Sequence, residues 1–226
     1  MNYRRIMVFG AHPDDEFAMA GTIAKLSMKK VKVTVLTFTD GCEGYPLPEM
    51  KDTIVATRRK ESNASDRVLG IHHHIHLEIP DMGLVNNKET ILRCVHAIRK
   101  ARPHAIFTHG PNESHRDHIA GHHISVEARW QAGEPVAAEF GPPWKTPHLY
   151  FYGGVDDVRP HIFYDVSETE HKRLLARAAH VTQHILWGRS REDFQEEAKW
   201  IKRSGRTFIE QLWLTDDFVL TDFPPR

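Results

Sequence analysis

The sequence is poor in cysteine and carries no excess charge of either sign. Its two cysteines, Cys42 and Cys94, are far apart and fit no Cys-x-x-Cys pattern. This argues against a disulfide scaffold or a structural zinc knuckle and favours a reducing compartment. Thirty basic residues balance thirty acidic ones, so no net field attracts nucleic acid or an anionic membrane. We therefore expect neither as a partner.

Long apolar segments are also lacking. No run approaches the roughly 20 residues that cross a bilayer. Residues 1–5 lead within a few positions into a charged motif, with no apolar signal-peptide region between them. We therefore predict a cytoplasmic protein. The 226 residues contain no internal repeat, low-complexity segment or dividing linker, which predicts a single domain over 1–226.

Short apolar segments alternate with amphipathic ones along the chain. The patterns predict strands over 4–9, 30–39, 71–79, 105–108, 149–152 and 161–166, and helices over 17–30, 53–69, 88–100, 119–129, 168–180 and 191–212. This alternation predicts an α/β, Rossmann-like three-layer fold with a mostly parallel sheet and helices on both faces. The first strand-to-helix turn has acids in place of Gly-x-Gly-x-x-Gly, and they would repel a pyrophosphate, so dinucleotide binding is disfavoured.

The first strand ends in Gly10-Ala-His-Pro-Asp-Asp-Glu16. His12 and Asp15 offer an imidazole and a carboxylate, a ligand pair suited to zinc or a similar divalent ion. The alternative is that Asp14, Asp15 and Glu16 only complement the positive end of a helix dipole. Three acids behind a His-Pro in one crowded turn favour the metal site, which then needs a further ligand from elsewhere.

A second cluster, Thr108-His-Gly-Pro-Asn-Glu-Ser-His-Arg-Asp-His118, follows another predicted strand. His115 and His118 are three residues apart at the start of a predicted helix, so both can face one cavity. Asp117 lies between them and could orient an imidazole from behind. A His-x-x-His pair alone is weak evidence among seventeen histidines, but together with the first motif it predicts a metal centre.

These two motifs resemble those of the LmbE-like (PIG-L type) metal-dependent N-deacetylases. The resemblance extends through Arg58-x-x-Glu61, Leu69-Gly70 and Asp81-Met-Gly-Leu84. It covers a metal-binding core of about residues 1–125, whereas residues 130–226 match only loosely. The resemblance implies one zinc ion per chain, with Fe²⁺ as an alternative, held by His12, Asp15 and His118.

The family resemblance also implies catalytic roles. Asp14 would be the general base that activates water, and His115 would stabilise the oxyanion or protonate the leaving amine. We place Asp117 with them as a catalytic residue. The implied reaction is removal of the N-acetyl group from an N-acetylglucosamine-type amino sugar or its conjugate, and the implied assembly is a homo-oligomer, a trimer or a hexamer.

Three residues are candidates for substrate binding. The resemblance makes Arg58 and Asp81 binders of sugar hydroxyls, although Arg58 could instead form an i,i+3 ion pair with Glu61 and Asp81 could cap a turn. Glu43 follows the second strand in a glycine-containing loop and could reach a ligand or lie in a solvated turn. Two rival functions stay open: an amidase for a larger acyl group or a non-sugar amide, and a non-catalytic sugar- or metal-binding module.

Two further features have no assigned role. Histidines at 72, 74 and 76 alternate along one predicted strand. Side chains two apart on a strand stand about 7 Å apart and point in parallel, so we expect a polar or interfacial sheet face rather than a metal site. The segment 131–147, rich in Gly and Pro, is too long for a routine connection, and we expect either a lid or an oligomer contact.

Overall fold

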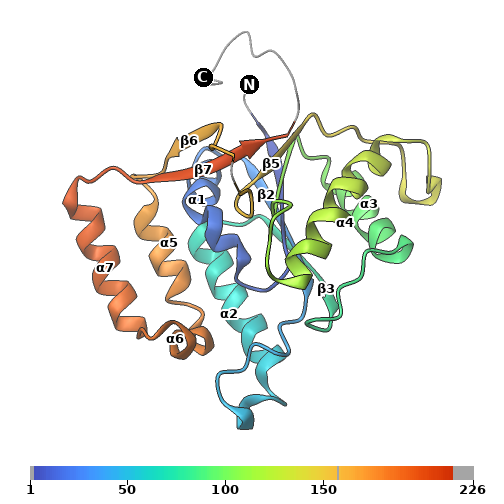
Figure 1. The fold of residues 1–226 in the computed structure, drawn as a ribbon. Coiled ribbons are helices and arrows are strands. Elements are labelled where there is room, and N and C mark those ends of the chain that lie inside the picture. The colour runs from blue at the N-terminus through green and yellow to red at the C-terminus, as the bar shows by residue number, and fades with distance from the viewer. Residues whose placement is uncertain (1–2, 157, 216–226) are drawn as a thin grey trace.

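A seven-stranded sheet forms the centre of the computed structural model, which describes residues 3–156 and 158–215 (Figure 1). The strand order is β3-β2-β1-β4-β5-β7-β6. The first five of these strands run parallel, and β7 pairs antiparallel with both β5 and β6. The strands are β1 Arg5–Gly10, β2 Lys32–Thr39, β3 His73–Ile79, β4 Ala105–Thr108, β5 His148–Phe151, β6 Ile162–Asp165 and β7 Ile209–Leu214.

Helices cover both faces of the sheet, which confirms the predicted fold class (Figure 1). On one face, α1 (Ala20–Met28), α2 (Ile54–Leu69) and α5 (Glu170–Arg177) share an apolar core with β1. On the other face, α3 (Lys88–Ala101) and α4 (Arg116–Gly133) pack on side chains of β2 and β4. The short α6 (Val181–Trp187) leads to α7 (Arg191–Ser204), which packs outside α5. Among the described residues, none of these helices has both the length and the apolar character needed to span a bilayer.

Three single-turn 3₁₀ segments complete the described elements, namely η1 (Asp15–Met19), η2 (Pro48–Met50) and η3 (Ala138–Phe140). The helix expected to begin at residue 17 therefore starts as η1 and becomes α-helical at Ala20. The predicted domain, 1–226, also includes residues 1–2, 157 and 216–226, which lie outside the described residues.

The helix predicted over 191–212 is wrong in its second half. Gly205 ends α7 in the left-handed conformation, with φ of 63°, which a residue without Cβ adopts at little cost. Beyond it, burial alternates with period two, Glu210 and Leu212 facing inward and Gln211 outward. Period two is the mark of a strand, and β7 forms there instead.

Two histidines of β3, His74 and His76, stack on each other instead of standing apart along the strand. The centroids of the two rings lie 3.9 Å apart. The expected separation of about 7 Å is therefore wrong for these rings. Nδ1 of His74 lies 2.9 Å from Asp66 Oδ2, and its Nε2 lies 2.9 Å from Thr37 Oγ1. Burial, then the neighbouring His74 and Arg59, lower the pKa of His76 to about 3. Both ring nitrogens of His74 have a hydrogen-bond partner within the protein, Asp66 and Thr37.

The buried guanidinium of Arg99 on α3 holds the segment 131–147 through hydrogen bonds. Arg99 is 4% exposed and donates to five backbone carbonyls, those of Gln131, Ala132, Glu134, Ala137 and Gly141. Trp144 Nε1 donates to the carbonyl of Pro103 at 2.8 Å, just before β4 begins. The predicted metal motifs follow the opposite, carboxyl ends of the strands, so the lid interpretation is wrong. The oligomer contact stays a prediction.

Removing the Arg99 guanidinium tests this anchoring. Arg99→Met keeps most of the side-chain volume but leaves buried carbonyls without donors, so we expect the free energy of unfolding in urea to fall by about 3 kcal/mol. Metal content of the folded protein should not change, because the segment lies at the other end of the sheet. The exposed neighbour Lys100→Met is the matched control. A variant of normal stability that has lost its metal would contradict this assignment.

Candidate metal centre and active site

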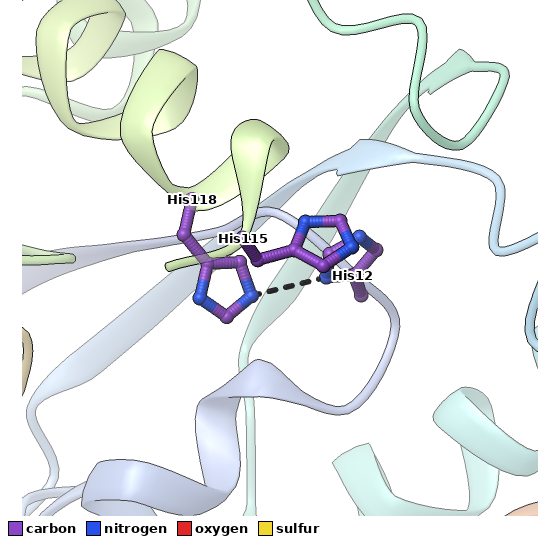
Figure 2. Close-up of side chains that lie close together, drawn as sticks. All are labelled: His12, His115 and His118. Carbon is purple, nitrogen blue, oxygen red and sulfur yellow. Dashed lines mark hydrogen bonds between the residues drawn. The ribbon is translucent and has the colours of Figure 1, made fainter. Parts of the chain in front are cut away.

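The candidate site lies where two adjacent parallel strands end. β1 and β4 pair with Ile6 opposite Ala105 and Val8 opposite Phe107, so the turn after β1 and the loop after β4 leave the sheet side by side. His12 comes from the first turn, His115 is the N-cap residue of α4, and His118 lies in the first turn of that helix. Figure 2 shows the three imidazoles gathered at one point.

The three predicted ligands bring their donor atoms together. His12 Nδ1 lies 3.2 Å from His118 Nε2, His118 Nε2 lies 3.4 Å from Asp15 Oδ1, and His12 Nδ1 lies 3.6 Å from Asp15 Oδ2. Tetrahedral ligands about 2.0–2.1 Å from zinc are separated from one another by about 3.3–3.4 Å. The donor set and its spacing therefore fit a zinc ion.

Neighbouring side chains offer overlapping ligand sets. Three groups have potential ligand atoms within 4.8 Å of one another: His12 with His115 and His118, Asp15 with His109 and His118, and His12 with Asp81 and Asp117. The predicted set shares two members with each of the first two groups. We favour it because its three separations are short and because Asp15 supplies the negative charge that three neutral imidazoles would lack.

The electrostatics of the centre favour a positive charge between its acids. Burial lowers the pKa of His118, but Asp15 and Glu113 outweigh it and raise that pKa to about 10. Burial raises the pKa of Asp15, but His109, His118 and His12 together bring it well below its usual range. His109 and His118 lower the pKa of Glu113 to about 2. The protein thus stabilises cationic charge here, as a divalent ion requires.

The three acids of the first motif have three different partners. Asp14 Oδ1 accepts from Arg58 Nη2 at 2.9 Å. Asp15 faces the imidazoles, whereas Glu16 points into the interior and accepts from Ser65 Oγ at 3.0 Å. Asp14 precedes η1 but makes no capping bond with its side chain. Asp15 and Glu16 do lie in the first turn of η1, but because each acid also has a specific side-chain partner, complementing a helix dipole is not their only role.

Arg58 and Glu61 do not form the ion pair considered from the sequence. Arg58 is 3% exposed and reaches the carbonyl of Gly41 at 3.2 Å as well as Asp14. Glu61 instead accepts from the backbone N and the Oγ1 of Thr182, at 2.8 and 2.6 Å. α2 thus contacts the turn after β1 through Arg58 and the start of α6 through Glu61.

Asp81 and Glu43 lie beside Arg58. Asp81 Oδ2 accepts from the backbone N of Glu43 at 3.1 Å, and its Oδ1 lies 3.7 Å from His12 Nε2. That Oδ1 atom is buried and has no hydrogen-bond partner. The side chain of Glu43 is exposed. The three predicted substrate contacts therefore surround the centre, but Arg58 and Asp81 are nearly buried, and their substrate roles stay predictions.

Asp117 orients the imidazole of His12. Its carboxylate is fully buried and lies 3.4 Å from His12 Nε2. It also accepts from the backbone N of Met82 at 2.7 Å and of Leu84 at 3.3 Å. The sequence placed Asp117 behind an imidazole without saying which one. The structure shows that it links the Asp81–Leu84 loop to the first motif.

Two residues of the centre were missed from the sequence, His109 and Glu113. His109 Nε2 lies 3.2 Å from Asp15 Oδ2, and its ring stacks on that of His118 with centroids 4.1 Å apart. Glu113 Oε2 lies 3.3 Å from His118 Nδ1. Both belong to the segment 108–118 already singled out, so a His and a Glu in the same short loop were the available signal.

The fold and the donor set define an α/β protein with a candidate histidine–carboxylate metal centre at the carboxyl edge of its sheet. The model of one protein family, described as PIG-L: GlcNAc-PI de-N-acetylase, matches residues 7–129. The chain belongs to this family, which confirms the resemblance inferred from the two motifs.

Known relatives agree with this assignment. A 1D-myo-inositol 2-acetamido-2-deoxy-alpha-D-glucopyranoside deacetylase from Rhodococcus erythropolis is 31% identical over 177 residues, which cover 66% of this chain and 60% of that protein. The chain therefore spans less than two thirds of that relative's length.

Two solved structures share the fold. N,N'-diacetylchitobiose deacetylase from Pyrococcus horikoshii has a TM-score of 0.80 at 24% identity, covering 94% of this chain and 84% of the other. The 4-carboxy-2-hydroxymuconate hydratase GalB from Pseudomonas putida has a TM-score of 0.77 at 20% identity, covering 97% of this chain and 99% of the other.

Gly44 controls the position of Arg58, which gives a test of the Arg58–Asp14 pair. A Cβ at Gly44 would lie 2.2 Å from Arg58 Nη1, so Gly44→Ala must push the guanidinium away from Asp14. We expect the rate of amine release to fall by up to about 10²-fold while metal content stays the same. At Gly133 an added Cβ meets only ordinary contacts at 3.6 Å or more, so Gly133→Ala is the control. Equal rates in both variants would show that the pair has no catalytic importance.

Proposed function

We propose that this protein is a zinc-dependent N-deacetylase that hydrolyses the acetamido group of an N-acetylglucosamine-type amino sugar or its conjugate. The observation that carries the proposal is the convergence of His12, Asp15 and His118 beside Asp14 and His115, two groups that are left over for chemistry. The family assignment and the deacetylase name of the Rhodococcus relative support it. Because the fold also occurs in a hydratase, the argument rests on the side chains of the site.

His12, Asp15 and His118 would hold the metal, one ion per chain. When bound, zinc supplies a Lewis acid that polarises the amide carbonyl and lowers the pKa of water. Iron(II) is an alternative, because two imidazoles and one carboxylate also suit that ion.

Asp14 is the proposed general base. It neighbours the ligand Asp15, and its side chain is 17% exposed, so it is accessible from the solvent side. Arg58 holds Oδ1 at 2.9 Å, which orients the carboxyl group and leaves Oδ2 to accept the proton of the attacking water.

His115 is the proposed donor to the oxyanion or the leaving amine. Its Nδ1 accepts from the backbone N of Asp117 at 3.2 Å, so in the neutral ring the proton resides on Nε2. The side chain is exposed, and its ring lies 4.5 Å from that of the proposed ligand His12, which supports this role. Acetate and the free amine are then the products.

Substrate recognition is proposed for the three residues on the Asp81 side. Glu43, the exposed member, would accept from sugar hydroxyls. Arg58 and Asp81 would act mainly by shaping the site, with only their edges available to substrate. Cytoplasmic location and assembly into a trimer or hexamer stay predictions from the sequence.

The metal and substrate assignments can be tested together. Freshly purified protein should contain about one zinc per chain, release amine from N-acetylglucosamine or its glycosides, and lose this activity with a chelator. The panel should include N-acyl groups larger than acetyl and N-acetylated amino acids. Amine from these alone would favour the rival amidase. Stoichiometric metal without amine from any substrate would favour a binding module, and full activity without metal would end the proposal.

Two substitutions separate the catalytic groups from the ligands. Asp14→Asn keeps the shape but cannot accept the proton, so kcat should fall by about 10²- to 10⁴-fold. His115→Ala should lower kcat by about 10²- to 10³-fold through loss of a donor. Both variants should retain zinc, measured by metal analysis, whereas His12→Ala should lose it. The exposed His123→Ala on the same helix as His115 is the control. If His115→Ala or Asp14→Asn loses zinc while His12→Ala keeps it, ligand and catalyst have been exchanged.

A further inference from the structure

Glu113 faces two stacked imidazoles at once. Its Oε2 lies 3.3 Å from Nδ1 of His118, and its Oε1 lies 3.7 Å from Nδ1 of His109. The two rings are 4.1 Å apart and nearly parallel, with an interplanar angle of 22°. One carboxylate thus meets the same edge of both rings, on the side away from Asp15.

This contact sets the proton position on His118. A carboxylate accepts hydrogen bonds but does not donate them when ionised, so the Nδ1 that faces Glu113 carries the proton. With a metal bound, Nε2 of His118 would offer its lone pair to the ion, on the side where Asp15 Oδ1 and His12 Nδ1 lie 3.4 and 3.2 Å away. A metal-binding histidine needs that lone pair, and carboxylates commonly secure it by accepting from the other ring nitrogen.

Through His109 the same carboxylate reaches the other half of the site. The backbone N of Ala11 donates to His109 Nε2 at 3.1 Å, so that nitrogen is the acceptor and the proton of His109 lies on Nδ1, toward Glu113. Ala11 directly precedes the ligand His12. Glu113 is therefore connected both to the helix that carries His118 and to the turn that carries His12 and Asp15.

The position of Glu113 is built into the backbone around it. The backbone N of Gly110 donates to the carbonyl of Gly153 at 2.8 Å, and that of Asn112 to the carbonyl of Gly154 at 2.7 Å. A Cβ at Gly154 would lie 2.5 Å from Glu113 Oε1, so the carboxylate packs directly on the backbone that follows β5. This close approach fixes the carboxylate against the imidazole edges.

We propose that Glu113 is a positioning residue for the metal, which holds the proton of His118 on Nδ1 and so presents Nε2 to the ion. The proposal rests on the proposed metal-dependent function. It assigns Glu113 no contact with the substrate, so its effect should appear in metal affinity before it appears in the chemistry.

The experiment measures zinc affinity in the absence of substrate, by competition with a chromophoric chelator. Glu113→Ala should bind zinc about 10- to 100-fold more weakly than the wild-type protein. Glu113→Gln should lose less, because its amide oxygen can still accept from Nδ1. The control is Glu127→Ala, a half-exposed position further along α4. Far-ultraviolet circular dichroism and the Tm of the metal-free forms establish that each variant is folded.

Two readouts separate positioning from a general structural effect. Saturating zinc should restore most of the kcat of Glu113→Gln, and ¹⁵N NMR of the zinc-loaded wild-type protein should show His118 protonated on Nδ1. Zinc affinity in both variants equal to that of the wild type, or protonation of His118 on Nε2, overturns the inference and leaves the deacetylase proposal intact. A wild-type protein that binds no zinc overturns both.

Discussion

The parallel pairing of β1 with β4 is the constraint on which the site depends. Each strand contributes one motif at its carboxyl end, and the register of Ile6 with Ala105 brings His12 and His118, 106 residues apart in the chain, to within 3.2 Å. Open α/β sheets generally place ligands at this edge, where neighbouring loops leave the sheet together. The polar cluster is therefore a consequence of strand order. The proposed set of ligands needs side chains from both motifs.

Charge compensation explains why so many different side chains surround this edge. Carboxylates withdrawn from water are costly unless each has a partner, and here each has a different one: Arg58 for Asp14, imidazoles for Asp15, and Ser65 for Glu16. Two buried oxygens, Glu16 Oε2 and Asp81 Oδ1, have no hydrogen-bond partner, and His12 Nε2 lies 3.7 Å from the latter. Five carboxylates, those of Asp14, Asp15, Asp81, Glu113 and Asp117, surround one guanidinium and four imidazoles. Such a surplus of acids over guanidinium groups is one that a divalent cation would reduce.

The sequence predicted those parts that local pattern determines. The strands before both motifs and the ends of α2 and α3 follow from short-range periodicity. The proposal of His12, Asp15 and His118 as ligands follows from a motif shared with a family, and the structure brings these three side chains together. The partners of Arg58 and Glu61 could not be predicted in this way, since both reach segments far away in the chain rather than each other. Strand β7 was missed because its amphipathic pattern was assigned to the preceding helix, although Gly205 marked the break.

Residues after the family match, which ends at residue 129, contact the elements that carry the site. Thr182 binds Glu61, Gln183 Nε2 donates to the carbonyl of Gly44 at 2.9 Å, and His180 Nε2 lies 3.7 Å from Glu16 Oε1. All three lie at the start of α6 or just before it, and each contacts an element that carries a residue of the site. The proposed ligands and catalytic groups thus all lie within the match over 7–129, whereas part of the support of the Gly41–Gly44 loop comes from outside it. A substitution at the start of α6 can therefore change the shape of the site without touching any of the proposed ligands.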